Sequence, residues 1–434
     1  MARTGRSWGR YPVTREVVIP LSDRGAPLPT GGKLMLPIGN ARSYGDSCLN
    51  DDGILLAARG LDHFIAFDPV TGVLTCEAGV LFSEILDLAV PQGWFLPVTP
   101  GTRFVTVGGA IANDVHGKNH HRAGTFGHHV LAFELVRTDG TRMRCAPDEH
   151  PDWFRATIGG LGLTGVITWA SIQLRRVQGP WMSAESHKFG NLDGFFALSA
   201  ASDRDYEYTV AWIDCVARGK ALGRGLFSRA NHAPARPDRR PGAPARTLSM
   251  PVTPPLSLIN SLSLRAFNQL YFHKQRKPVT HATSHYQPFF YPLDGIAHWN
   301  RMYGPKGFLQ YQCVVPPIGA DEAVRDLIKA IADSGTGSFL AVLKQFGDRT
   351  SPGMLSFARP GATLALDFPF QGTATLRLLD RLDEITVAAG GAVYPAKDAR
   401  MSGDNFRRYF PAHEAFAAYI DPGLSSSFWR RVQA

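Results

Sequence analysis

Cysteine is scarce and unpaired in this sequence. The five cysteines, at positions 48, 76, 145, 215 and 313, are odd in number and show no CxxC or other paired spacing. A disulfide framework and a thiolate zinc site are therefore not expected, and a reducing, cytoplasmic compartment fits. The chain has no run of about 18 apolar residues, so no membrane-spanning helix is expected. Its basic N-terminus lacks the apolar stretch of a signal peptide, and none is expected.

Acidic residues are almost missing from one long stretch. Between Cys215 and Thr280, Asp238 is the only acid against twelve Lys and Arg residues, in a chain whose net charge is +9. Two interpretations are open: a solvated loop, or a contact for anionic lipid headgroups or a phosphorylated substrate. The second would place the protein peripherally on the inner face of the cell membrane. Nucleic acid is not an expected partner, because aromatic residues are sparse there and no recognition motif accompanies the charge.

Three common signatures occur in contexts that do not suit them. The GxGxxG at residues 160–165 follows an expected helix and precedes an expected strand, which is the reverse of a dinucleotide fingerprint. No strand is expected before the GxSxG at residues 5–9, so a serine hydrolase is not expected. Five histidines between residues 116 and 129 are interrupted by glycines. That stretch is expected to be loop, and no metal site is expected.

The length of 434 residues predicts two domains. Residues 34–180 alternate short strands and helices, with a helix from residue 81, a hairpin turning at 138–140, a helix at 152–158 and a strand from 165. Apolar spacing predicts further helices at 323–335 and 376–391. We expect a first domain at 1–178, a second at 179–392 with a mobile basic loop near 215–280, and a segment at 393–434 that returns to the first domain.

Three glycine-bearing segments follow one another in the first domain. PIGNARSYGD occupies residues 37–46, directly after an expected strand; PGT and TVGGAIA lie between 100 and 112; HGKNHH leads to GTFG at 116–127. Small residues let backbone N–H groups approach an anion, and Arg42 adds positive charge. Each segment alone is weak, but the order and spacing of the three are specific.

This order is similar to that of the decaprenylphosphoryl-β-D-ribose 2-oxidases, flavoproteins of the vanillyl-alcohol-oxidase superfamily. The likeness extends over nearly the whole chain, through FFYPLD at 289–294, WNRMYG at 299–304, GFLQYQ at 307–312, SFLAVLKQFG at 338–347, DFP at 367–369 and YPAKDAR at 394–400. The resemblance implies an α+β, two-domain, PCMH-type FAD-binding fold. Its second, substrate-binding or cap domain would be built on an antiparallel sheet.

The resemblance also implies roles for particular residues. FAD would contact Gly39, Asn40, Ala41, Arg42, Ser43, Tyr44, Gly101, Thr102, Val105, Gly108, Gly109, Ala110, Asn113, His116, Gly117, Gly165 and Tyr394. The substrate would contact Lys118, Arg301, Gln310, Gln312, Thr363 and Ala365, and the catalytic residues would be Lys397, Tyr291, His116 and Lys344. No histidine lies between Gly39 and Asn50, where many members of the superfamily attach the flavin covalently. FAD is therefore expected to be non-covalent.

The implied activity is oxidation of the 2-hydroxyl of a polyprenyl-phosphate-linked pentose to a 2-keto sugar. It would be the oxidative half of a 2-epimerisation in cell-envelope arabinan biosynthesis, with an NAD(P)H-dependent short-chain reductase as partner. Thr363 and Ala365 stand where mycobacterial members of the family have asparagine and cysteine. Two alternatives stay open: a soluble alditol, aldonolactone or sugar oxidase of the same fold, and a flavin-binding protein without turnover.

Overall fold

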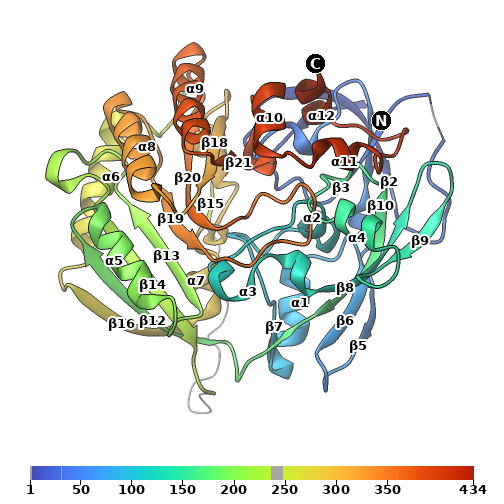
Figure 1. Ribbon diagram of the computed structural model, residues 1–434, viewed down its shortest axis with the longest axis horizontal. Helices are drawn as coiled ribbons and strands as arrows, with labels where there is room; N and C mark the ends of the chain where they lie inside the picture. The colour runs from blue at the N-terminus through green and yellow to red at the C-terminus, as the bar shows by residue number, and fades with distance from the viewer. Residues whose placement is uncertain (1, 31, 236–247) are drawn as a thin grey trace.

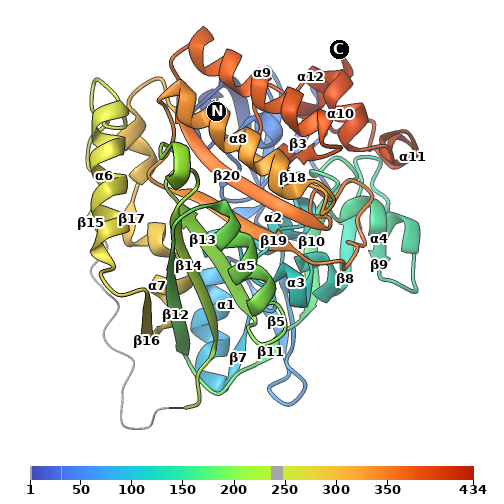
Figure 2. The ribbon, with the colours of Figure 1, turned by 60° about the vertical axis from the view of Figure 1, so that its left-hand side comes forward.

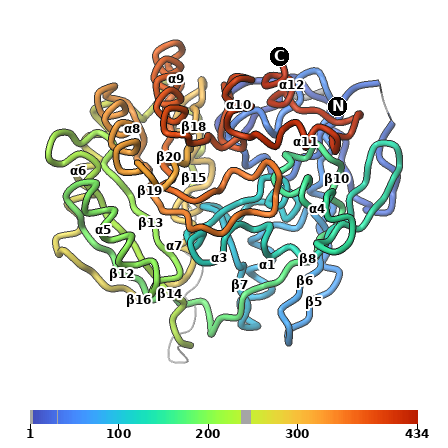
Figure 3. The backbone as a smooth tube through the Cα atoms, viewed as in Figure 1, coloured from blue at the N-terminus to red at the C-terminus, as the bar shows by residue number. Residues whose placement is uncertain are grey.

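The computed structural model describes residues 2–30, 32–235 and 248–434. The chain forms two halves that lie side by side, and both termini lie over the half that holds the first strands (Figure 1). The backbone trace shows the segment between β19 and β20 reaching from the second half to the first (Figure 3). There the N–H of Met354 donates to the carbonyl of Arg155 at 3.0 Å.

The first half contains two sheets. A four-stranded sheet has the order β1-β2-β4-β3, in which the last three strands are parallel. Its strands are β1 Ala2–Arg6, β2 Val13–Pro20, β4 Ile54–Ala57 and β3 Met35–Ile38. A five-stranded antiparallel sheet has the order β5 Phe64–Phe67, β6 Val73–Glu77, β10 Val166–Gln173, β8 Val130–Val136 and β9 Arg142–Cys145. The short strands β7 Trp94–Phe95 and β11 Arg175–Arg176 pair beside it.

Short helices connect these strands. They are α1 Phe82–Ala89, α2 Val107–Ala112, α3 His120–Ala123 and α4 Pro151–Thr157. Helix α1, helix α4, the hairpin of β8 and β9, and strand β10 confirm the elements predicted for this region. Because α4 precedes and β10 follows residues 160–165, that GxGxxG lies in the reverse of the dinucleotide-binding order.

The second half is built on an eight-stranded sheet in the order β16-β12-β14-β13-β19-β20-β18-β21. The strands are β16 Val279–His285, β12 Trp181–Phe189, β14 Gly225–His232, β13 Tyr208–Ile213, β19 Ala341–Phe346, β20 Gly361–Pro369, β18 Phe308–Val315 and β21 Ala392–Val393. The expected boundary at 178/179 falls between β11 and β12. All pairings in this sheet are antiparallel.

Successive side chains along these strands point to opposite faces of the sheet, so the sheet has two different faces. On one face, Leu309, Leu343 and Leu364 pack against helices α5 Leu192–Ser202, α8 Ala320–Ser334 and α9 Thr373–Ala388 in one buried core. Helices α8 and α9 confirm the two helices predicted from apolar spacing, and Gly335 forms the expected C-cap with a φ of 69°. The helices cover that face in both ribbon views (Figures 1 and 2). The opposite face is left for the cavity described below.

The basic stretch is more regular than expected. It contains β14, β15 Leu248–Ser249 paired with β17 Ile296–Ala297, and helix α6 Ser261–Lys274. The expectation of a loop is wrong for these parts, and residues 236–247 lie outside the described residues. Part of the charge is also neutralised: Arg224 pairs with Asp214 at 2.8 Å and Arg229 with Glu185 at 2.6 Å.

The remaining helices are α7 Tyr286–Phe290, α10 Gly403–Tyr409, α11 His413–Ala417 and α12 Ser427–Gln433. After β21 the chain runs back to the first half, where the N–H of Met35 donates to Gly423 at 2.8 Å and Ser425 donates to Met35 at 2.9 Å. In the described ranges no helix is both long and apolar enough to cross a bilayer.

Candidate active site

A cavity of about 710 Å³ lies between the two halves. The first half contributes the loop after β3, the loop before α2 and the segment at 116–118. The second half contributes the open face of its large sheet, and the turn after β21 completes the wall. The cavity thus collects segments that lie far apart in the sequence.

The loop after β3 presents unused hydrogen-bond donors. In the described chain, the backbone N–H groups of Asn40, Ala41 and Arg42 donate to no protein acceptor, although all three residues line the cavity. These residues are half-buried, and backbone donors that a bound ligand covers need a partner. Gly39 permits close packing here, because a Cβ at that position would lie 2.2 Å from the hydroxyl of Thr106. The Arg42 guanidinium lies over the Trp8 ring at 4.1 Å.

Two side chains on adjacent walls contact one another. The amide Nε2 of Gln312 donates to Nε2 of His116 at 2.8 Å, which places the imidazole proton on Nδ1. Nδ1 is buried without a partner among the described residues. Burial holds the pKa of His116 well below its usual value, and the charge of Lys344 lowers it further, so the ring is neutral.

On the open face of the sheet, the pairing register of β18 and β20 brings polar residues together. Gln312 pairs with Ala365 and Gln310 with Asp367 across β18 and β20. Gln310 donates to Oδ1 of Asp367 at 2.6 Å, and the hydroxyl of Tyr303 donates to Oδ2 at 3.4 Å. Burial raises the pKa of Asp367 to about 7, against the opposing effects of Gln310 and Lys397.

Three half-buried lysines line the same cavity, and withdrawal from solvent lowers the pKa of each. The values are about 7 for Lys118, about 8 for Lys344 and about 7 for Lys397. The ammonium of Lys118 donates to the carbonyl of Phe289, and at 3.3 Å to that of Phe290. Lys344 donates to the carbonyl of Gly117 at 3.4 Å. Amines with such pKa values gain most from an anionic ligand, which would stabilise their charged forms.

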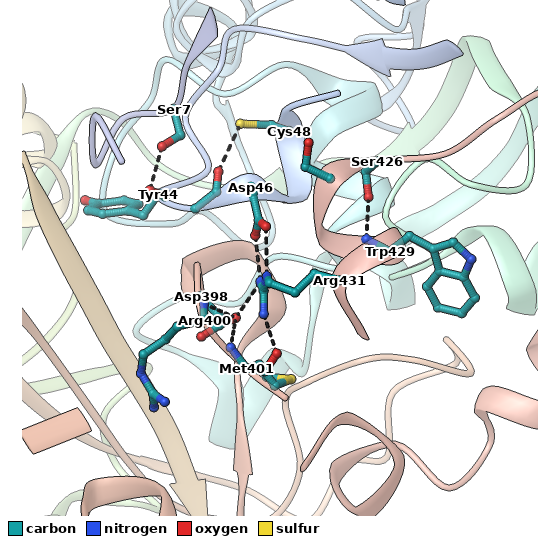
Figure 4. Close-up of polar contacts among 12 residues, drawn as sticks. Ser7, Tyr44, Asp46, Cys48, Asp398, Arg400, Met401, Ser426, Trp429 and Arg431 are labelled. Carbon is teal, nitrogen blue, oxygen red and sulfur yellow. Dashed lines mark hydrogen bonds and ion pairs between the residues drawn. The ribbon is translucent and has the colours of Figure 1, made fainter. Parts of the chain in front are cut away.

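Lys397 is held by contacts between the two ends of the chain. It ends the 3-10 turn Pro395–Lys397, and its Nζ lies 3.7 Å from the centre of the Tyr44 ring. The N–H of Tyr44 donates to Ala396 at 2.9 Å. The residue directly after Lys397 is Asp398. Arg431 of α12 binds both Asp46 and Asp398, at 2.7 and 3.0 Å (Figure 4). This links the loop after β3 to the turn that carries Lys397.

The structure brings most of the expected site residues to the cavity. The lining includes Lys397, His116, Lys344, Lys118, Gln310, Gln312, Ala365, Gly39, Asn40, Ala41, Arg42, Ser43, Tyr44, Gly101, Thr102, Val105, Gly108, Gly109, Asn113, Gly117, Gly165 and Tyr394.

Four expected residues are not part of the lining. Tyr291 packs in a hydrophobic core, and its hydroxyl is 2.7 Å from that of Thr99. Arg301 donates to the carbonyls of Met250 and Pro251 at 3.0 and 2.8 Å, away from the cavity. Thr363 is buried and accepts from Gln312 at 3.4 Å. Ala110 packs inside the first half, on the buried side of α2.

Sequence reasoning missed Asp367 and the apolar end of the cavity. The sequence could have indicated Asp367, because it is the one charged residue in the strand GATLALDFP. A buried carboxylate is costly unless it has partners, so its presence in such a strand favours a functional role. The apolar end includes Trp212 and Tyr271, whose ring centres are 4.7 Å apart. These two residues come from β13 and α6, and no local pattern relates them.

Comparisons with known proteins agree with this geometry. Residues 31–146 match the FAD binding domain family. The chain is 35% identical over 453 residues to the decaprenylphosphoryl-β-D-ribose oxidase of Mycolicibacterium smegmatis, covering 98% of this chain and 96% of that protein. It is 36% identical over 369 residues to an uncharacterised protein of Streptomyces coelicolor, covering 81% and 100% of the two chains. Human delta(24)-sterol reductase is 34% identical over 114 residues, covering 26% and 22%.

The fold and the cavity define an FAD-dependent oxidoreductase with the α+β, two-domain, PCMH-type architecture of the vanillyl-alcohol-oxidase superfamily. Within that class, the chain belongs to the decaprenylphosphoryl-β-D-ribose oxidase family. The residues present fit the cofactor. Nε of Arg42, Oγ of Ser47 and Nδ1 of His116 line the cavity as buried atoms without partners in the described chain. Together with the unused backbone N–H groups of the loop after β3, they suit the acceptor oxygens of a dinucleotide.

Proposed function

We propose that the protein oxidises the 2-hydroxyl of a polyprenyl-phosphate-linked pentose to a 2-keto sugar. The observation that carries this proposal is the composition of one cavity, which is lined both by three half-buried lysines and by the apolar pair Trp212 and Tyr271. Amines attract a phosphate, and the apolar end suits a hydrocarbon chain. The name of the Mycolicibacterium smegmatis relative supports the same substrate class.

The reaction removes a hydride from the carbinol carbon and a proton from its oxygen. When bound, FAD supplies the acceptor for the hydride. We assign charge stabilisation to Lys397, whose ammonium is favoured by Asp367. Proton acceptance is assigned to Lys344, because burial alone lowers its pKa, to about 8, and no carboxylate opposes that effect as Asp367 does at Lys397. His116 is less suited to this step because its Nε2 already accepts from Gln312.

Tyr291 is also poorly suited to accept the proton. Burial raises its pKa well above the usual value, and its hydroxyl is already within hydrogen-bond distance of Thr99. Gln310 and Gln312 would orient the sugar, since both line the cavity between His116 and Asp367.

Mass spectrometry tests the proposal directly. The purified protein is incubated with a polyprenyl-phosphoryl ribose under air, and the expected product is lighter by two hydrogens. Anaerobic bleaching of the flavin by the same substrate gives an independent readout. Bleaching by an alditol or an aldonolactone, with none by the lipid-linked pentose, would instead identify a soluble sugar oxidase. Bleaching by neither would indicate a flavin-binding protein without turnover.

Two associations follow from the proposed substrate. The 2-keto product would need an NAD(P)H-dependent short-chain reductase to complete a 2-epimerisation. A substrate anchored by a prenyl chain would also require the protein to work at a membrane surface. Conversion of the lipid-linked ribose to its 2-epimer on addition of such a reductase and NAD(P)H tests the first association.

A further inference from the structure

Helix α6 exposes apolar side chains that the fold does not cover. Leu262 and Leu270 are 77% and 75% exposed, and with Ala266 they form a stripe at i, i+4 and i+8. Leu256, in the segment that leads into the helix, is 79% exposed. We define the outer face of α6 as Leu262, Ala266 and Leu270 together with Leu256. An exposed apolar stripe of this kind often marks a contact surface.

The opposite side of the same helix closes the cavity. Leu264 and Phe272 are buried against the second half. Tyr271 lines the cavity next to Trp212. One helix, about 10 Å thick, therefore separates the outer face from the apolar end of the cavity. Figure 2 shows α6 at the edge of the molecule.

The charges around this face are of one sign. Arg265, Lys274, Arg276 and Lys277 are exposed, and none of them forms an ion pair within the described residues. Residues 248–280 contain no Asp or Glu. A second copy of the chain docked on this face by a twofold axis would place these cations against their equivalents, which costs energy. An anionic surface would instead neutralise them.

We propose that the outer face of α6 docks on an anionic lipid bilayer, with its leucines inserted and its cationic residues at the headgroups. This rests on the proposed function in one respect: the docked helix places the apolar end of the cavity next to the membrane that holds the prenyl chain. The contact combines apolar burial with charge attraction, as surface-bound amphipathic helices do.

Vesicle sedimentation of the FAD-loaded protein tests the surface. Wild type is expected to sediment with vesicles of phosphatidylcholine and phosphatidylglycerol, and less with phosphatidylcholine alone. The double variant Leu262→Gln with Leu270→Gln should bind at least about tenfold more weakly, because two leucines leave the apolar contact. Glutamine keeps helix propensity, and FAD content reports folding. In 1 M salt, where screening shortens to about 3 Å, wild-type binding should weaken but persist.

A matched control uses exposed apolar residues elsewhere. Val70, 83% exposed, lies between β5 and β6, and Ile318, 95% exposed, lies between β18 and α8. Val70→Gln with Ile318→Gln should bind vesicles like wild type. The docking surface is overturned if wild type binds no vesicles, or if the α6 variant and the control bind equally. It is also overturned if light scattering shows that the α6 variant dissociates a dimer while its vesicle binding is unchanged.

Activity separates this proposal from the proposed function. With a water-soluble, short-chain analogue of the lipid-linked pentose, the α6 variant should oxidise as fast as wild type. With the long-chain substrate in vesicles it should be slower by about the loss in binding. If wild type oxidises neither substrate, the proposed function fails, whereas vesicle binding still decides the surface. Equal rates of the variant and wild type on the vesicle substrate would overturn the membrane route.

Discussion

Lys397 is the residue on which the proposed chemistry depends most. Its Nζ lies 3.7 Å from the Tyr44 ring and faces the charge of Asp367. If Lys397 only formed an ordinary surface ion pair, that pair would contribute under about 1 kcal/mol of stability. A cation placed to stabilise charge in the transition state is typically worth about 3 kcal/mol, or a factor of ~10² in rate.

Lys397→Ala should therefore fold and retain FAD, yet substrate should reduce its flavin roughly two orders of magnitude more slowly under anaerobic conditions. Stopped-flow absorbance measures the rate, and Lys220→Ala, at an exposed position, is the control. A variant with full flavin content and an unchanged rate would remove Lys397 from the catalytic set. Charge stabilisation would then have to come from Lys344.

Asp367 should set the pH range in which Lys397 is charged. Its carboxylate raises the pKa of Lys397, whereas burial lowers that pKa to about 7. Asp367→Asn keeps an oxygen for the Gln310 hydrogen bond but removes the charge, so the pKa of Lys397 should fall further. The alkaline limb of flavin reduction, where activity is lost as Lys397 deprotonates, should move to lower pH. A limb that stays in place would show that the two groups are not coupled.

At the scale of elements, helix α12 fastens the C-terminal segment to the site. Arg431 binds Asp46 through two hydrogen bonds, at 2.9 and 2.7 Å, and reaches Asp398 at 3.0 Å (Figure 4). Gly45 is needed between them, because a Cβ there would lie 1.5 Å from the carbonyl oxygen of Asp398. Two buried carboxylates thus share one guanidinium, and Asp398 also accepts from the N–H groups of Arg400 and Met401 at 3.0 and 2.8 Å.

Arg431→Met should destabilise the protein by roughly 3–5 kcal/mol, because it leaves buried charge unpaired. Denaturant unfolding of the FAD-free protein measures the change. Arg407→Met is a matched control, since its exposed pair with Asp404 should contribute under about 1 kcal/mol. Adding Asp46→Asn to Arg431→Met should recover part of the loss. Equal effects of the two arginine substitutions would show that the Arg431 contacts carry no special weight.

At the scale of the whole molecule, the cofactor is expected to be held by many dispersed contacts. Cys48 lines the cavity, but burial raises the pKa of its thiol to about 12, so little nucleophilic thiolate is present. No histidine lies between Gly39 and Asn50. Acid precipitation of the holoenzyme should therefore give a yellow supernatant and a colourless pellet. A pellet that stays yellow after washing would show a covalent bond to the flavin.

The sequence by itself determined the local elements and the cofactor class. Periodicity located α8 through Val324, Leu327, Ile328 and Ile331, all of which are buried. Three glycine-bearing segments indicated where the backbone could approach an anion, and their resemblance to those of a known flavoprotein family identified the FAD-binding half. Helix periodicity and glycine-bearing turns are short-range properties, because they depend on residues that are close together in the sequence.

Tertiary structure alone decided which side chains share the cavity. Gln310 meets Asp367 through strand register, and Trp212 of β13 meets Tyr271 of α6. Tyr291 and Arg301 belong to blocks typical of the family, yet one turns into a core and the other to main-chain carbonyls. The direction of a side chain depends on packing between distant segments. A one-residue change of register would reverse it, and no local pattern contains that information.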